Sequence, residues 1–179
     1  SGNIIERYKE QKDLQNESAH YEIEYTMSES LEADFVNSCS QFNSEPVEGS
    51  LHMGDDGYPY GIPMDHYYNE ENGKIYFHCA LEGHKMDAVK ACDKVSYCVF
   101  DEGYRNEGEW ALNIKSVIVF GRVRVLDDHE QGLRMAELLA EKFTDDRAYI
   151  DHELKYSGPR MACLEITPEH MTGKLVNES

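Results

Sequence analysis

Two glycine-containing turns between segments of alternating apolar residues constrain the fold of this 179-residue chain more than any other feature. The turns are Asp55-Asp56-Gly57 and Asn72-Gly73. Glycine accepts the positive φ that tight hairpin turns need, and a period of two places alternate side chains on one face of a strand. The pattern therefore predicts an antiparallel meander of three strands, at residues 47–53, 58–68 and 75–79.

The remaining elements follow from period and composition. Residues 95–100 and 116–126 are rich in β-branched residues and predict two strands, and Gly121 within the second predicts a bulge. The predicted helices are 28–39, 84–91, 129–143 and a short one within 145–157, and the last predicted strand is 161–166, followed by a polar tail. The helix 129–143 has an apolar stripe formed by Leu133, Ala136, Leu139, Ala140 and Phe143.

Six antiparallel strands of this length favour a small barrel, because closure removes the strand edges that would otherwise aggregate. The predicted fold class is therefore α+β, a six-stranded antiparallel β-barrel with flanking helices. Residues 1–28 are polar, with sparse apolar positions, and predict an N-terminal arm. Residues 29–179 are expected to form the barrel domain.

Composition excludes several classes of partner. The net charge is −18, which argues against a nucleic-acid-binding protein and against docking on anionic membranes, since both need clustered Lys and Arg. The five cysteines include no C-x-x-C pair and their number is odd. Reduced thiols in the cytoplasm are the simplest interpretation. No run of 18 apolar residues occurs, so no membrane-spanning helix is predicted.

One segment, residues 77–85, combines a strand end, a glycine and a helix start with a cation in its first turn. Free N–H groups at a helix start, together with Lys85, could hold an anion such as a phosphate; a solvated surface lysine is the alternative. His78 is more often structural than catalytic in such a position. A metal site is not predicted, because His78 and Cys79 are adjacent on a strand and point to opposite faces.

Five motifs in order then resemble a known family. They are residues 56–64 (DGYPYGIPM), 73–80 (GKIYFHCA), 82–85 (EGHK), 116–121 (SVIVFG) and 166–174 (ITPEHMTGK). Together the motifs resemble the 5-nitroimidazole-resistance branch of the pyridoxamine-phosphate-oxidase-like flavin split barrels. The similarity extends over residues 29–175 and makes residues 29–179 an expected FMN-binding split-barrel domain.

The resemblance implies that FMN lies at the interface of a homodimer. Pro63 and Met64 are then expected along the flavin ring, and His78 is the residue expected beside the substrate, with a catalytic role. The full set of residues that the resemblance assigns to the cofactor is Pro63, Met64, His78, Cys79, Ala80, Gly83, His84, Lys85, Ser116 and Val117. The last three residues of the 82–85 motif would hold the FMN phosphate, in agreement with the helix-start argument.

The chain departs from the family pattern at two places. His84 stands immediately before Lys85 in the phosphate loop, and the chain lacks the Arg-Leu-x-Pro ending of true pyridoxamine-phosphate oxidases. That ending helps to bind the substrate phosphate, so vitamin B6 oxidation is not expected. Residues 1–28 have no counterpart in the family pattern.

The function predicted from the resemblance is an FMN-dependent oxidoreductase. It would pass electrons from a reduced nicotinamide, NAD(P)H, to a small electron-poor organic acceptor, as nitroimidazole reductases do. The first alternative is a non-catalytic flavin- or haem-binding protein, with His78, His84 or His170 as the axial ligand of a haem. The second is a barrel without a cofactor that serves as an interaction module.

Overall fold

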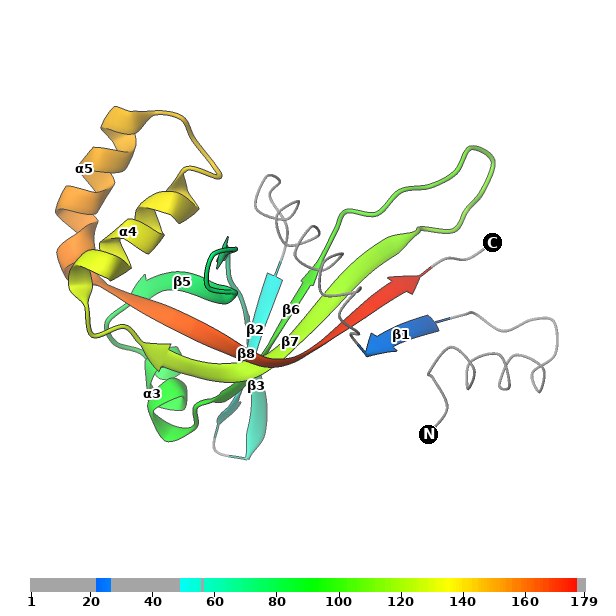
Figure 1. Ribbon diagram of the computed structural model, residues 1–179, viewed down its shortest axis with the longest axis horizontal. Coiled ribbons are helices and arrows are strands. Elements are labelled where there is room, and N and C mark those ends of the chain that lie inside the picture. Colours follow the sequence, from blue (N-terminus) through cyan, green and yellow to red (C-terminus); the bar gives the residue numbers. More distant parts are fainter. Residues whose placement is uncertain (1–21, 27–48, 56, 177–179) are drawn as a thin grey trace.

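The computed structural model describes residues 22–26, 49–55 and 57–176 (Figure 1). The predicted helix 28–39 lies outside these residues, as do the first two residues of the strand predicted at 47–53. Within the described residues, α-helices and antiparallel strands occur in separate layers, so the predicted α+β class is confirmed.

The strands form one antiparallel sheet in the order β3-β2-β6-β7-β8-β5-β4, with β1 paired to β8. They are β1 (Glu22–Thr26), β2 (Gly49–Asp55), β3 (Tyr58–Pro63), β4 (Tyr67–Asn69), β5 (Lys74–Ala80), β6 (Lys94–Phe100), β7 (Ile114–Val125) and β8 (Met161–Val176). Over the part of the chain that the structure describes, the sheet therefore has eight strands, whereas the sequence predicted six. It curls strongly but stays open, with β3 and β4 at the two ends of the order (Figure 1).

The longest strand, β8, connects the two halves of the sheet. One of its edges pairs with β7 from Leu164 to Val176, and the other pairs first with β5 and then with β1. The prediction of a strand ending at residue 166 and a polar tail was wrong. Residues 167–176 stay extended because β7 and β1 supply their hydrogen-bond partners, a non-local effect that polar side chains do not reveal.

The segment predicted as one strand at 58–68 is two strands. The chain leaves β3 after Pro63 and enters β4 at Tyr67. The Met64 N–H donates to the Gly49 carbonyl (2.9 Å), whereas the Met64 carbonyl accepts from the Tyr97 hydroxyl (2.9 Å). A core side chain therefore takes the place of a strand partner, and the ladder ends there.

The helices of the described residues are α3 (His84–Ala91), α4 (His129–Ala140), α5 (Arg147–Ser157) and the 3-10 turn η1 (Gly158–Arg160). The predicted helix 84–91 is confirmed residue for residue. The helix predicted to reach residue 143 ends at Ala140, and Phe143 is 52% exposed. The N–H groups of Lys142 and Phe143 bond three residues back, and this tighter turn carries Phe143 away from the apolar stripe.

The predicted glycine positions have the expected geometry. Gly57 and Gly73 have φ of 85° and 67° at their turns. The β7–β8 register shifts between Phe120 and Gly121, as the predicted bulge requires. A Cβ at Gly121 would stand 2.4 Å from the Thr167 carbonyl oxygen, so the two strands approach too closely for any side chain there.

Two apolar clusters hold the fold together. The larger fills the inner face of the curled sheet and includes Leu51, Tyr97 and Leu164, each fully buried. The smaller lies on the outer face, where α4 packs against β5 and β8 through Tyr76 and Met135. The helix α4 thus covers the part of the outer face that β4, β5 and β8 form (Figure 1).

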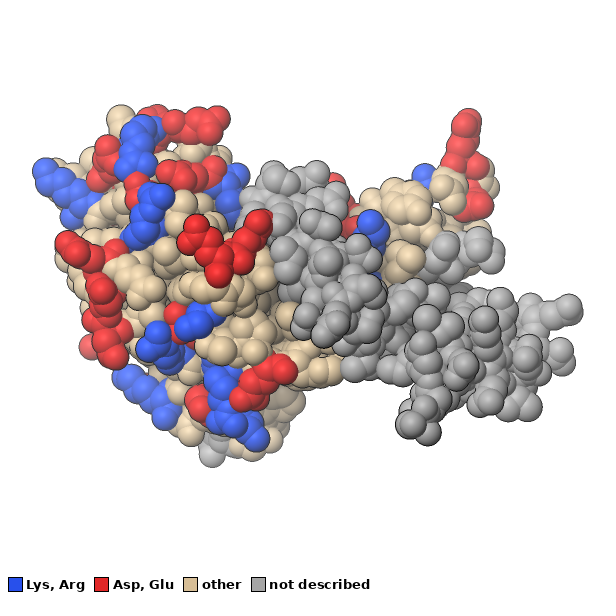
Figure 2. Space-filling view, viewed as in Figure 1, with Lys and Arg blue, Asp and Glu red and all other residues tan. Residues whose placement is uncertain are grey.

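Charged side chains of both signs intermingle over α4 and α5 on the face that Figure 2 shows. Arg147 of α5 pairs with Glu137, Glu141 and Asp151. None of the helices in the described ranges has the length and apolar character needed to cross a membrane.

Candidate functional site

The first turn of α3 presents backbone N–H groups without a capping side chain. Gly83 precedes the helix with φ 121° and ψ 172°, a conformation that only glycine adopts readily. Glycine has no side chain, so the N-cap residue makes no side-chain hydrogen bond to the N–H groups of this turn. Such donors ordinarily bond to a cap, to water or to a ligand.

The half-buried Lys85 stands at the same place. Its Nζ atom is 3.6 Å from Met64 Sδ, which is a weak acceptor. Within the described ranges no carboxylate forms an ion pair with Lys85. An ammonium group without a counterion beside uncapped N–H groups fits a bound anion of the phosphate class.

His78, Cys79 and Ala80 form the end of β5, and their side chains alternate. His78 and Ala80 point outward, whereas the Cys79 thiol is buried 3.7 Å from Met86 Sδ. The pKa of His78 is lowered, mainly because the ring is partly buried. The charge of Asp65 acts in the opposite direction, and the charge of Lys85 adds to the lowering. His78 is therefore neutral at pH 7 and carries one N–H donor and one acceptor. Cys79 can face a ligand only through its main chain.

The β3 end meets the α3 start. The ring of His84 packs edge-on against Tyr60, with centroids 4.6 Å apart. Met64 reaches Lys85, and Pro63 directly before it is exposed. Seven of the predicted residues are thereby gathered around the first turn of α3 and the end of β5: Met64, His78, Cys79, Ala80, Gly83, His84 and Lys85.

Ser116 and Val117 lie on β7, farther along the sheet. Ser116 pairs with Phe100, and Phe100 lines a cavity of about 380 Å³ together with Pro63 and Met64. Ser116 is thus connected to the β3 end through one neighbour. The Val117 side chain is 6% exposed and packs in the inner core, so it offers a ligand only its main chain.

A buried polar network holds Met64 in place, and no motif in the sequence indicated it. The Tyr97 hydroxyl donates to the Met64 carbonyl and lies 3.0 Å from Nδ1 of His66. Lys142 Nζ donates to the His66 carbonyl (3.0 Å). Burial, and to a smaller degree Lys142, lower the pKa of His66 to about 3, so its ring stays neutral. Every one of these groups is satisfied within the chain.

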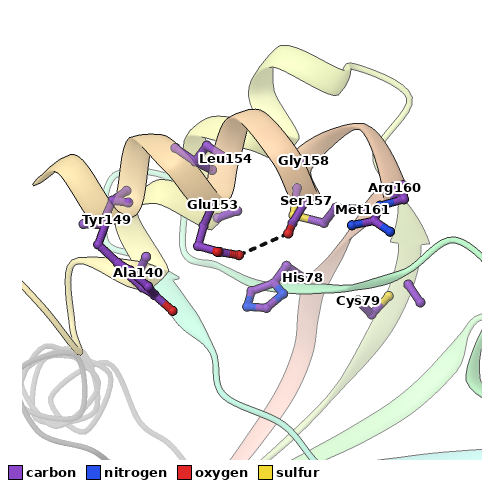
Figure 3. Close-up of a pocket in the computed structure, with 13 residues that line it drawn as sticks. His78, Cys79, Ala140, Tyr149, Glu153, Leu154, Ser157, Gly158, Arg160 and Met161 are labelled. Carbon is purple, nitrogen blue, oxygen red and sulfur yellow. Dashed lines mark hydrogen bonds between the residues drawn. The ribbon is translucent and has the colours of Figure 1, made fainter. Parts of the chain in front are cut away.

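A pocket of about 490 Å³ opens beside His78, between the end of β5, α4 and α5 (Figure 3). Its walls are mainly apolar and include Ala136, Ile150 and Leu154. Arg160, at the end of η1, also lines it. The sequence did not reveal this pocket, because its walls come from segments more than 50 residues apart that only the fold brings together.

Comparisons with known proteins agree with this architecture. The family model for pyridoxamine 5'-phosphate oxidase matches residues 47–175. A candidate 5-nitroimidazole antibiotic resistance protein from Bacteroides thetaiotaomicron has a similar structure, with a TM-score of 0.65 at 18% identity over 90% of this chain and 94% of that one. No curated protein has a matching sequence.

Two further solved structures share the fold. An FAD-binding protein from Mesorhizobium loti superposes with a TM-score of 0.58 at 20% identity over 87% of this chain and 99% of that one. An FAD- and haem-binding protein from Mycobacterium smegmatis superposes with a TM-score of 0.57 at 16% identity, over 87% of this chain and 74% of that one. These similarities confirm the expected split-barrel fold, and the matched family model includes most of the described sheet. The chain belongs to the pyridoxamine 5'-phosphate oxidase family.

Proposed function

We propose that this protein binds FMN and acts as an oxidoreductase toward a small electron-poor organic acceptor, with a reduced nicotinamide as electron donor. The observation that carries the proposal is the uncapped first turn of α3 with Lys85, a half-buried cation without an ion-pair partner among the described residues. A phosphate there would satisfy both features. The family match and the flavin-binding relatives support a flavin nucleotide as the molecule that carries this phosphate.

A mononucleotide suits this site better than a dinucleotide. One short helix start and one lysine provide donors for a single terminal phosphate, and the net charge of −18 disfavours a second.

Each gathered residue then has a role. Bound flavin supplies hydride transfer, which no amino-acid side chain can perform alone. Lys85 and the α3 amides hold the phosphate, and Met64 contacts the cofactor from the residue that follows β3. His78 is neutral, so it orients an acceptor through one hydrogen bond rather than serving as a cationic acid.

We also propose a homodimer with the cofactor at its interface. Neither α4 nor α5 packs on β6 or β7, whose outer face exposes Phe100 (39%) and Phe120 (43%). Ser116 lies on the same face, so a second copy there would bring it close to a bound cofactor. The cysteines of the described residues are all free thiols, which suits a cytoplasmic protein.

The test is a spectrum followed by turnover. The purified protein, reconstituted with FMN, is expected to show flavin absorbance, to be reduced anaerobically by NADH or NADPH, and to be reoxidised by a 5-nitroimidazole. His78→Ala should retain FMN and reoxidise more slowly. A flavin that binds but is reduced by neither nicotinamide contradicts the oxidoreductase assignment.

Haem is the second candidate cofactor, because one structural relative binds FAD and haem. His170 is exposed and stacks on Phe120 with centroids 6.0 Å apart, which leaves its ring nitrogens accessible. An intense Soret band after haem addition, without flavin binding, would favour this alternative.

A further inference from the structure

The pocket between α4, α5 and the end of β5 has the properties of a small-molecule site. Its volume of about 490 Å³ lies within the range of roughly 300–1,000 Å³ that is typical of ligand pockets. It shares His78, Cys79 and Ala80 with the proposed flavin site, but no residue of β3 or α3 lines it. A molecule in this pocket could therefore reach His78 without displacing a phosphate from Lys85.

Some polar groups of the pocket already have hydrogen-bond or ion-pair partners within the protein, and others do not. The Glu153 carboxylate accepts a hydrogen bond from Ser157 (3.1 Å), and its other oxygen lies 3.5 Å from His152 Nδ1 (Figure 3). Arg160 has no ion pair within the described ranges, and His78 has no hydrogen bond there. The Arg160 guanidinium, the His78 imidazole and the Tyr149 hydroxyl are thus available to a ligand.

The shape of the pocket sets the rest of the ligand. Ala140 and Tyr149 lie toward one end and Arg160 toward the other, with His78 between them (Figure 3). The two alanines of α4 that line the pocket leave room for a flat group against the helix, whereas larger side chains would fill it. An apolar wall and one unpaired cation at an end match a planar molecule with one anionic substituent.

We propose that this pocket binds the organic acceptor, and that the acceptor is a planar, mainly apolar molecule whose single anionic group contacts Arg160. Its ring lies between α4 and α5, and His78 donates a hydrogen bond to it. The name acceptor depends on the proposed oxidoreductase function, whereas the binding of such a molecule does not.

The charge contact is tested with 4-nitrobenzoate and its uncharged analogue 4-nitrobenzamide, by isothermal titration calorimetry on the full chain with and without FMN. We expect the wild type to bind the acid more tightly than the amide. Arg160→Gln should weaken binding of the acid about tenfold and leave the amide unchanged. Arg105→Gln, at another exposed arginine, is the matched control and should change neither.

The location is tested by filling the pocket. Ala140→Leu, at the last residue of α4, should weaken both probes at least tenfold, as overlap with bound ligand requires. Ala91→Leu, at the last residue of α3, is the matched control and should leave both unchanged. Circular dichroism and FMN binding that match the wild type show that the variants are folded.

The flavin measurement separates this proposal from the preceding one. Simultaneous binding of FMN and 4-nitrobenzoate supports an acceptor site beside the cofactor. If the two compete, the pocket belongs to the flavin site and the proposal is overturned. If FMN does not bind but Arg160-dependent binding of 4-nitrobenzoate persists, the oxidoreductase function fails while the ligand site stands. Unchanged affinities in Arg160→Gln and Ala140→Leu overturn the ligand site itself.

Discussion

The polar residues around the candidate site are of two kinds: some are hydrogen-bonded within the protein, and others have no carboxylate partner among the described residues. His66 and Tyr97 are buried, and their polar atoms bond to each other and to the main chain of residue 64. Lys85 and Arg160 reach no carboxylate within the described ranges. The first pair fixes the backbone, because buried satisfied networks are costly to rearrange. Lys85 and Arg160 are available to ligands. We therefore assign a structural role to His66 and Tyr97 and a ligand-binding role to Lys85 and Arg160.

His66 gives a pH dependence that can be measured. Its pKa falls from 6.5 in the unfolded chain to about 3 in the folded one, so the unfolded state takes up a proton first as pH decreases. Its contribution to stability is complete above pH 6.5 and is lost as pH falls toward 3. Between pH 6.5 and 4.5 the wild type should lose about 2 kcal/mol more unfolding free energy than His66→Asn.

Urea denaturation at the two pH values measures this difference. Asn keeps a polar contact to Tyr97 but does not titrate, so the comparison cancels the carboxylates that also protonate in this range. Parallel pH profiles for the two proteins would contradict the buried neutral state of His66.

At the scale of elements, a buried carboxylate on β8 ties three strands together. Glu165 is 1% exposed and accepts hydrogen bonds from Lys74 (2.9 Å), Arg124 (2.7 Å) and Tyr76 (3.0 Å). Burial alone would raise its pKa, but the hydrogen bonds from these three residues lower it overall. The carboxylate thus links β5, β7 and β8 beneath α4.

Glu165→Gln should therefore cost about 1–3 kcal/mol of unfolding free energy, since the amide cannot accept from all three donors. Glu169→Gln is the matched control: Glu169 pairs with Arg122 on the exposed surface and should contribute less than about 1 kcal/mol. Chemical denaturation at pH 7 distinguishes the two. Equal losses would mean that the buried network adds nothing beyond a surface ion pair.

The bulge in β7 yields a second prediction about an element. A Cβ at Gly121 would meet the Thr167 carbonyl at 2.4 Å, whereas a Cβ at Gly54 meets nothing within 4 Å. Gly121→Ala should destabilise the protein by about 1–3 kcal/mol through overpacking, and Gly54→Ala by less than about 1 kcal/mol. Thermal unfolding compares them, and a neutral Gly121→Ala would contradict the close approach of the strands.

Local signals in the sequence predicted some elements and missed others. Gly57, Gly73 and Gly121 marked two turns and the bulge correctly, because backbone geometry at those points depends on one residue. The extension of β8 and the break at Met64 depend on distant partners in β7 and β6, which no local pattern contains.

The same distinction holds for the candidate site. The motif at residues 82–85 predicted the start of α3 and its cation, because the glycine, the helix start and Lys85 are neighbours in sequence. Arg160, Glu165 and His66 gave no signal, since their significance arises from elements that the fold brings together.

At the scale of the whole molecule, the outer face of β6 and β7 carries none of the helices that the structure describes. Phe100 and Phe120 are exposed on neighbouring strands there, whereas α4 packs on β4, β5 and β8 (Figure 1). Exposed aromatic residues grouped on one face are typical of interaction surfaces. A second copy of this chain is the proposed occupant.

Phe120→Glu should convert the dimer to monomer. In a two-fold interface the substitution places a carboxylate on both subunits, and the two like charges repel each other. Sedimentation velocity measures the change, and FMN affinity should fall with it if both subunits form the site. Phe143→Glu, at an aromatic residue that is 52% exposed near α4, should leave the dimer intact. A wild-type protein that sediments as a monomer with FMN bound would contradict the proposed interface.

The most direct test of the central claim compares FMN with riboflavin, which lacks the phosphate, by flavin fluorescence titration of the wild type and Lys85→Gln. We predict that the wild type prefers FMN over riboflavin by at least about tenfold and that Lys85→Gln removes most of this preference without changing riboflavin affinity. Equal affinities of the wild type for FMN and riboflavin would contradict a phosphate site at the start of α3.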